Sequence, residues 1–114
     1  MVNKDKIIAR ALVRMGINAP EDLPTAAQRS QVDNVLTSIH EDWVDQNIVR
    51  WELDSIPASL ANAVVTCAAY KCANDFALSD QRYNRLAIDY ELSMESITAY
   101  NQRFYSGTAP IQEF

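Results

Sequence analysis

Glycine and proline are scarce in this sequence, with two glycines and four prolines among 114 residues. These two residue types build the tight turns between strands, so their scarcity disfavours a β-sheet protein with many turns. The chain is long enough for one hydrophobic core and too short for two. With 48% hydrophobic residues, the composition predicts one folded domain whose helix content is well above average.

Cysteine and histidine are also rare, which limits the chemistry that the chain can support. Cys67 and Cys72 are five residues apart, an offset of about 140° around a helix, so they are not placed to form a disulfide or share a metal ion. We expect buried free thiols in a reducing compartment. The sequence contains no H-E-x-x-H, no G-x-S-x-G and no glycine-rich phosphate loop, and it therefore predicts no cofactor and no bound metal.

Long apolar runs are missing as well. A membrane span needs about 20 consecutive apolar residues, and no stretch approaches that length. The start of the chain also lacks the hydrophobic segment of a signal peptide. We therefore expect no membrane partner and a protein that works, or is assembled, inside a cell.

Acidic residues exceed basic ones by 15 to 10, which gives a net charge of −5. Such a chain is a poor candidate for binding nucleic acid by neutralising phosphates. The first 14 residues are the exception, because they carry four basic residues and one acidic residue. Lys6, Arg10 and Arg14 would form one stripe on a helix. A solvated face is the expected role of this stripe, and contact with an acidic protein partner is the alternative.

Hydrophobic periodicity predicts a first helix over residues 3–15. Asn3 is available as the N-cap, and apolar residues recur at three- and four-residue intervals along the segment. Gly16 can adopt the left-handed conformation just after the helix, and Ile17 can fold back onto the last turn. The local sequence thus specifies both ends of this helix.

A second helix is predicted to begin at Thr25, which forms a capping box with Gln28. Its apolar face ends near Trp43, and the segment "DQNI" follows. Asn47 then takes the place that Gly16 has in the first helix, and Ile48 the place of Ile17. We therefore expect the second helix to end in the same way as the first.

Beyond Ile48 the apolar residues alternate. Val49, Trp51 and Leu53 are separated by charged residues, which predicts a short strand or extended segment with one buried face. Pro57 would end this segment and serve as the first residue of a third helix over residues 57–78. That helix is apolar nearly all round and rich in alanine, which predicts a central position among the helices.

The last predicted helix begins at Ser79 or Asp80 and holds the helical period to near Tyr105. At about 25 residues it would be about 37 Å long, more than a core of this size requires. We therefore expect part of it to pack against another subunit, through the residues Tyr90, Met94, Ile97, Tyr100 and Phe104.

The chain closes with a short tail. Gly107 and Pro110 disfavour further helix, so the sequence predicts a helical domain over residues 1–106 and a tail over residues 107–114. Tyr105, Ile111 and Phe114 are apolar residues at or within this otherwise polar end. Such residues can anchor a peptide in the groove of a partner protein, and we expect that role for them.

The segment "HEDWVDQNIVRW" contains the only histidine. A hydrolase could use His40 with Glu41 or Asp45 as acid and base. However, His40, Glu41 and Asp42 are consecutive on a helix and point in different directions. The favoured interpretation is a solvated helix end, with the two tryptophans as core anchors.

The order and spacing of these features resemble those of the head-to-tail adaptor proteins of tailed bacteriophages, also called connector, neck or tail accessory proteins. The resemblance covers about residues 7–78 and rests on four segments: "IIARALVRMGI", "IHEDWVDQNI", "VRWELDSIP" and "LANAVVTCAAYKCANDFAL". The long last helix and the tail agree with that family in layout. The sequence thus predicts an all-α bundle of about four helices with one short extended segment and a C-terminal tail.

The resemblance implies a structural virion protein and not an enzyme. Members of this family form a homo-oligomeric ring, commonly of twelve subunits, beneath the portal protein of a DNA-filled capsid. They bind the portal on one side, often through the C-terminal segment, and tail or nozzle proteins on the other. DNA passes through the ring without sequence-specific binding, and Glu41, Asp42 and Asp45 are candidates for residues that face this channel. The ring would be assembled in the host cytoplasm. A small hydrolase and a helical protein-interaction module are the alternatives.

Overall fold

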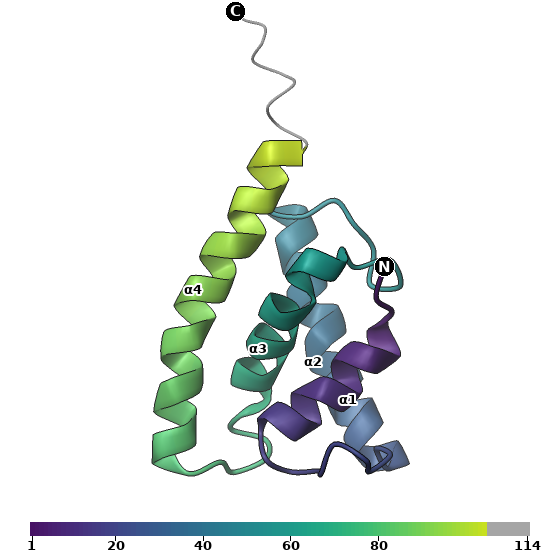
Figure 1. Ribbon diagram of the computed structural model, residues 1–114, viewed down its shortest axis with the longest axis vertical. Helices are drawn as coiled ribbons and strands as arrows, with labels where there is room; N and C mark the ends of the chain where they lie inside the picture. Colours follow the sequence, from purple (N-terminus) through teal and green to yellow (C-terminus); the bar gives the residue numbers. More distant parts are fainter. Residues whose placement is uncertain (105–114) are drawn as a thin grey trace, which may run out of the picture.

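The computed structural model in Figure 1 describes residues 1–104. It contains the helices α1 (Lys4–Arg14), α2 (Ala26–Asp45), α3 (Ala61–Cys72) and α4 (Asp80–Phe104), and the short 3-10 helix η1 (Ala58–Leu60). Residues 1–104 contain no strand, and an isolated antiparallel bridge joins Val2 to Ile56. The predicted all-α class with about four helices is therefore confirmed. The boundary between domain and tail lies outside the described residues.

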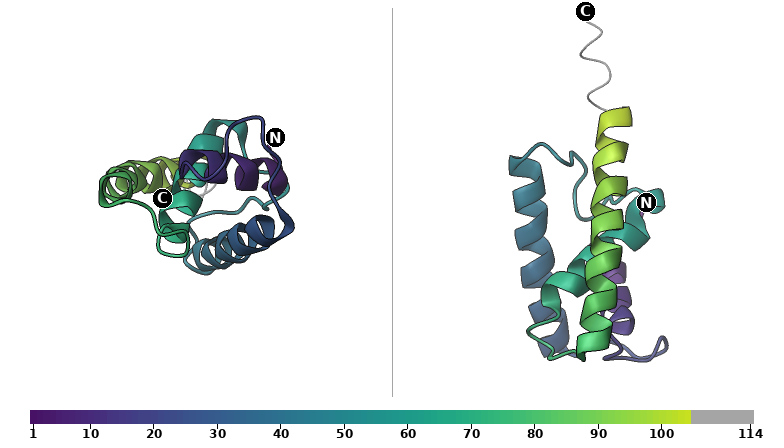
Figure 2. Two further views of the ribbon diagram at one scale, coloured as in Figure 1. Left: turned by 90° about the horizontal axis from the view of Figure 1, so that it is seen from below. Right: turned by 90° about the vertical axis from the view of Figure 1, so that its left-hand side faces the viewer.

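Helix α3 occupies the centre of the bundle. It packs against α1, α2 and α4, whereas α4 packs mainly on α3. Seen end-on in Figure 2, α4 lies at one side of the bundle and α1 and α2 at the other. Eight of the twelve residues of α3 are buried, most of them alanine, valine and cysteine. Because these side chains are small, three helices can approach α3 closely, and the predicted central position is confirmed.

The predicted ends of the first two helices are confirmed by their hydrogen bonds. Gly16 and Asn47 both have positive φ angles, of 78° and 60°. The amides of Gly16 and Ile17 donate to carbonyl groups in the last turn of α1 at 2.9 and 3.0 Å. Those of Asn47 and Ile48 donate to the last turn of α2 at 3.0 and 2.8 Å. Both ends are Schellman motifs, in which the left-handed residue satisfies carbonyls that the helix leaves unpaired.

The helix starts also follow the sequence. The Asn3 side chain accepts from the Lys6 amide at 3.0 Å at the start of α1. Thr25 and Gln28 form the full capping box of α2, with the two reciprocal hydrogen bonds at 3.1 and 3.0 Å. At the start of α4 the Arg82 amide lies 3.3 Å from the Ser79 hydroxyl. Each cap satisfies amides that have no partner within the helix.

The third helix is shorter than predicted at both ends. Pro57 has an extended ψ of 133°, and it precedes η1 instead of opening an α-helix. At the other end α3 stops at Cys72, six residues before the predicted end, and the chain turns until Ala77 adopts a φ of 52°. Asn74 and Asp75 lie in this turn, and their side chains favour turns over helix. The early stop lets α4 run back along α3.

The predicted extended segment is only partly correct. Val49 and Trp51 are buried while Arg50 and Glu52 are exposed, so the expected alternation is present. It ends early, because the chain turns where the Ser55 amide donates to the Glu52 carbonyl at 2.9 Å. The segment has no partner strand among the described residues, and its buried residues pack on helices.

Both cysteines are buried free thiols, as predicted. Burial raises the pKa of the Cys67 thiol to about 12. The pKa of the Cys72 thiol is raised to about 12 as well, mainly by burial and further by the charge of Asp75. Desolvation disfavours the thiolate, so both groups stay protonated at neutral pH. Among residues 1–104, none of the helices combines the length and the apolar character that crossing a membrane requires.

Candidate functional site

The acidic cluster predicted to face a channel lies at the carboxyl end of α2. Glu41, Asp42 and Asp45 are all exposed. A shallow hollow of about 550 Å³ brings Glu41 and Asp45 together with His40, Glu52 and one cation, Arg50, while Asp42 lies outside it. The fold therefore places a local negative charge at this end of the molecule, with two of the three predicted carboxylates in one hollow.

His40 has a structural contact in this hollow. Its Nε2 lies 2.8 Å from the carbonyl oxygen of Trp51, so the ring donates its Nε2 hydrogen there. The rings of His40 and Trp51 are 5.6 Å apart, and Trp43 packs edge-on against Trp51 at 6.2 Å. Both tryptophans are buried, which confirms their role as core anchors. Through Nε2, His40 holds the extended segment against α2.

The predicted interface stripe on α4 points into the chain's own core. Ile97 has no exposed surface, and Tyr90, Met94 and Tyr100 are partly buried against the core. Tyr90 also packs 4.7 Å from the ring of Tyr70 on α3. The assignment of Ile97 to a subunit interface is therefore corrected, because an apolar stripe packs on whichever apolar surface is nearest, and here that surface is α3.

Burial is described for none of the four remaining predicted residues. Phe104 is the last residue of α4. Tyr105, Ile111 and Phe114, the predicted portal-docking residues, lie outside the described residues.

The outer face of α4 carries the exposed apolar residues. Ile88 is 67% exposed and Leu92 is 59% exposed, and they are four residues apart on one face. Glu91 and Glu95 are exposed on one side of this pair. These two carboxylates line a shallow hollow of about 370 Å³ with Met94. The longest helix thus presents an apolar stripe beside an acidic flank, and we call Glu91 and Glu95 the acidic flank.

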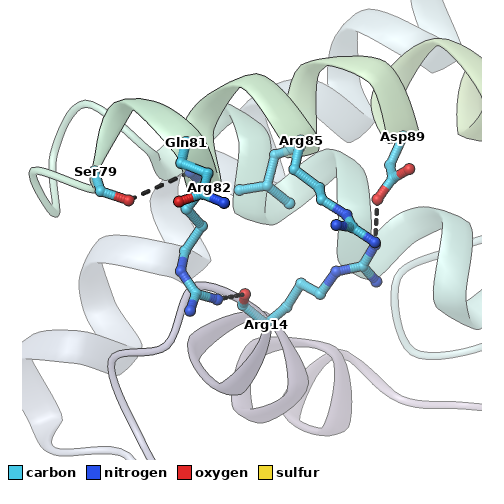
Figure 3. A pocket seen from close by; sticks show the side chains of 7 residues that line it. Arg14, Ser79, Gln81, Arg82, Arg85 and Asp89 are labelled. Carbon is cyan, nitrogen blue, oxygen red and sulfur yellow. Dashed lines mark hydrogen bonds and ion pairs between the residues drawn. The ribbon is translucent and has the colours of Figure 1, made fainter.

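On the other side of the stripe, three arginines surround a hollow of about 600 Å³ between the end of α1 and the first turns of α4 (Figure 3). Arg14 pairs with Asp89 at 2.9 Å. The Arg82 guanidinium donates to the Arg14 carbonyl at 3.1 Å and lies over Gly16. Arg85 also reaches into the hollow, and it has no hydrogen-bond or ion-pair partner among the described residues.

A second hollow, of about 380 Å³, continues along α4. It shares Arg14 and Asp89 with the first, and Leu92 also lines it. Its other lining residues are small or polar, from η1, α3 and α4: Ser59, Asn62, Ala63, Thr66, Ser93 and Ser96. The two hollows together form one groove, basic at the start of α4 and neutral further along, which we call the arginine groove.

The sequence alone did not predict the arginine groove. Arg14 was expected in a solvated stripe with Lys6 and Arg10, which are exposed. Instead, Arg14 turns to α4, where Arg82 and Arg85 meet it from positions about 70 residues away in the chain. Arg82 and Arg85 are three residues apart and therefore lie on one face of a helix. The neighbouring sequence does not indicate which other element that face contacts.

Each flank of the stripe carries charges without an ion-pair partner among residues 1–104, namely Arg85 on one side and Glu91 and Glu95 on the other. Glu91 and Glu95 are four residues apart on one face, a spacing at which like charges repel. Like Arg85, neither has an ion-pair partner within the described part of the chain. No group of three or more metal-ligating side chains occurs within residues 1–104. The chemistry that this surface offers is therefore charge pairing next to apolar contact.

The chain was also compared with known proteins. No protein-family model, no curated protein and no solved structure matches it.

Proposed function

We propose that this chain is a structural subunit of a homo-oligomeric ring that joins the portal to the tail of a bacteriophage and continues the DNA channel. The observation that carries the proposal is the outer face of α4. Ile88 and Leu92 are well over half exposed on a 25-residue helix at the side of the bundle. Exposed apolar residues beside charged ones are typical of a surface that binds another protein.

The packing of α4 supports this proposal. Helix α4 contacts mainly α3 within the chain, so its outer face and both flanks are open to neighbours. Burying what remains exposed of Ile88 and Leu92, 67% and 59% of the residue, would contribute about 1–2 kcal/mol each before the costs of association. A ring multiplies this contribution, because every subunit makes the same contact twice.

The acidic end of α2 supports the channel part of the proposal. A channel for DNA must not bind the phosphate backbone, and exposed carboxylates repel it. Glu41, Asp42 and Asp45 provide this charge at one end of the molecule. We propose these three residues as the channel-facing group, and the portal as the partner of the tail residues Tyr105, Ile111 and Phe114.

The proposal is tested by mass measurements on the chain alone and mixed with a portal protein from the same virus. We expect a monomer or small species alone and a ring on the portal. The variant Leu92→Glu should prevent ring formation because it places a charge in the apolar stripe. Glu52→Gln, a change at an exposed position outside α4, is the control. A chain that stays monomeric and ignores the portal would refute the proposal.

The tail is tested separately. Deleting residues 107–114 should abolish portal binding and leave the helix content by circular dichroism unchanged. Portal binding that persists after the deletion would show that another surface docks. Neither result bears on whether the stripe on α4 is needed for ring formation, which the Leu92→Glu variant tests.

The small-hydrolase alternative would use His40, whose Nε2 atom donates to the Trp51 carbonyl, with Glu41 or Asp45 in the same hollow. It would require turnover that disappears in His40→Ala and Glu41→Ala with the fold retained. A helical interaction module shares the exposed stripe with the ring subunit, and the portal mixture separates the two.

A further inference from the structure

The two charged regions of α4 lie on opposite sides of its apolar stripe. Relative to Arg85, simple helix geometry places Leu92 and Ile88 at offsets of about 20° and 60°. Glu95 and Glu91 follow at about 80° and 120° in the same direction. The order around the helix is therefore basic, apolar, acidic. Because these residues belong to one rigid helix, its acidic flank cannot reach its own arginine groove.

The groove has an excess of positive charge in a chain that is negative overall. Arg14, Arg82 and Arg85 line one hollow with Asp89 as the only carboxylate of its lining. The chain as a whole carries a net charge of −5. Like charges at close range disfavour the arrangement unless an anionic group compensates them. The groove is open and about 600 Å³ in volume, which is room for side chains of a protein partner.

We infer that the arginine groove of one copy receives the acidic flank of a second copy, with the two α4 helices running parallel. Three features of one helix support this occupant: the unpaired Arg85, the unpaired Glu91 and Glu95, and the exposed stripe between them. A free anion would explain only the first. In the ring, the copy on one side pairs with the arginine groove and the copy on the other side pairs with the acidic flank, and these contacts cover Ile88 and Leu92.

The parallel direction follows from the order of charges. When two identical helices pack in parallel, opposite flanks face each other, as in the charge pairs of parallel coiled coils. When they pack antiparallel, equal flanks meet, and here arginine would face arginine. Parallel contacts that use two different flanks build a closed ring when the rotation is right.

This inference rests on the ring proposed above and names the contact between its subunits. The test is sedimentation velocity of the full chain over a range of concentrations, at about 0.02 M and about 0.5 M salt. Self-association should occur at low salt and weaken at high salt, because charge pairs are screened. Circular dichroism of every variant checks that the fold is retained.

Charge reversal gives the decisive comparison. Arg85→Glu and Glu91→Arg should each weaken self-association about 100-fold, because each brings like charges together. Mixing the two variants should restore it to within a few-fold, and so should the double variant, since a reversed pair attracts again. Lys6→Glu and Glu52→Arg make the same charge changes on exposed positions outside α4 and are the matched controls.

The outcomes separate the two ideas. Reversals that weaken association no more than the controls, or a mixture without rescue, overturn the inference while leaving a ring that forms on the portal intact. Charge-dependent association without portal binding supports the inference and overturns the proposed function. A chain that is monomeric under every condition, with and without portal, overturns both.

Discussion

The clearest test of the fold compares two isoleucines on opposite faces of α4. Ile97 has no exposed surface, whereas Ile88 is 67% exposed. Replacing isoleucine by alanine removes three carbon atoms at each site, and it changes helix propensity in the same favourable direction by a few tenths of a kcal/mol. The difference in unfolding free energy between the two variants therefore reports the effect of burial alone.

The expected magnitude follows from the burial of each side chain. At Ile97 the lost transfer free energy is about 2.4 kcal/mol, at about 0.8 kcal/mol for each carbon. The cavity left between α4 and α3 adds to this, which brings the expected loss of unfolding free energy to about 3–4 kcal/mol. At Ile88 the change should stay within about 0.5 kcal/mol.

Urea unfolding followed by circular dichroism measures both variants. Ile97→Ala should lower the midpoint strongly without changing the slope, and Ile88→Ala should leave it nearly unchanged. In sedimentation velocity, Ile88→Ala should weaken self-association more than Ile97→Ala does, because only Ile88 belongs to the proposed contact. Similar losses of stability at the two sites, or a loss below about 1 kcal/mol at Ile97, would refute the placement of α4 on α3.

Two further predictions concern the helix end and the thiols. Gly16→Ala should lower the unfolding free energy by about 1–2 kcal/mol in urea melts, because φ is 78° there and an added Cβ would lie 3.0 Å from the Arg82 guanidinium. Asn47→Gly is the control that should be neutral or stabilising, and a neutral Gly16→Ala would contradict the assigned backbone. For the thiols, burial raises the pKa of Cys67 and Cys72 from 9.0 to about 12, so the unfolded chain loses these protons first. Stability should be unaffected below pH 9 and fall as pH rises toward 12, more steeply than in a variant with alanine at both positions; parallel pH profiles would contradict the burial.

The helix boundaries that the sequence predicts well are those set by neighbouring residues. Asn3, Gly16, Asn47 and the pair Thr25 and Gln28 act within a few residues of chain, because caps bind the nearest unpaired amides and carbonyls. The end of α3 was predicted wrongly by the same method. The apolar run continues to Leu78, but the helix stops at Cys72 so that the chain can reverse.

The candidate site was less predictable. The stripe of α4 is apolar, as predicted, and Ile97 packs inside the chain and not on another subunit, while Tyr90 and Tyr100 are only partly buried against the same core. Periodicity identifies an apolar face, whereas the identity of the surface that covers it depends on how the other helices pack. The exposed pair Ile88 and Leu92 interrupts the polar face of α4, and this signal was available in the sequence.

Local sequence was sufficient for the all-α class, the four helices and most of their ends, since hydrophobic period and capping act over one or two turns of chain. Only the packing of α1 and α4 on α3 placed Ile97 inside and Ile88 outside. The same packing brought Arg14 beside Arg82 and Arg85, from positions about 70 residues apart. Such long-range neighbours depend on the burial of the whole core. No short segment of the sequence specifies them.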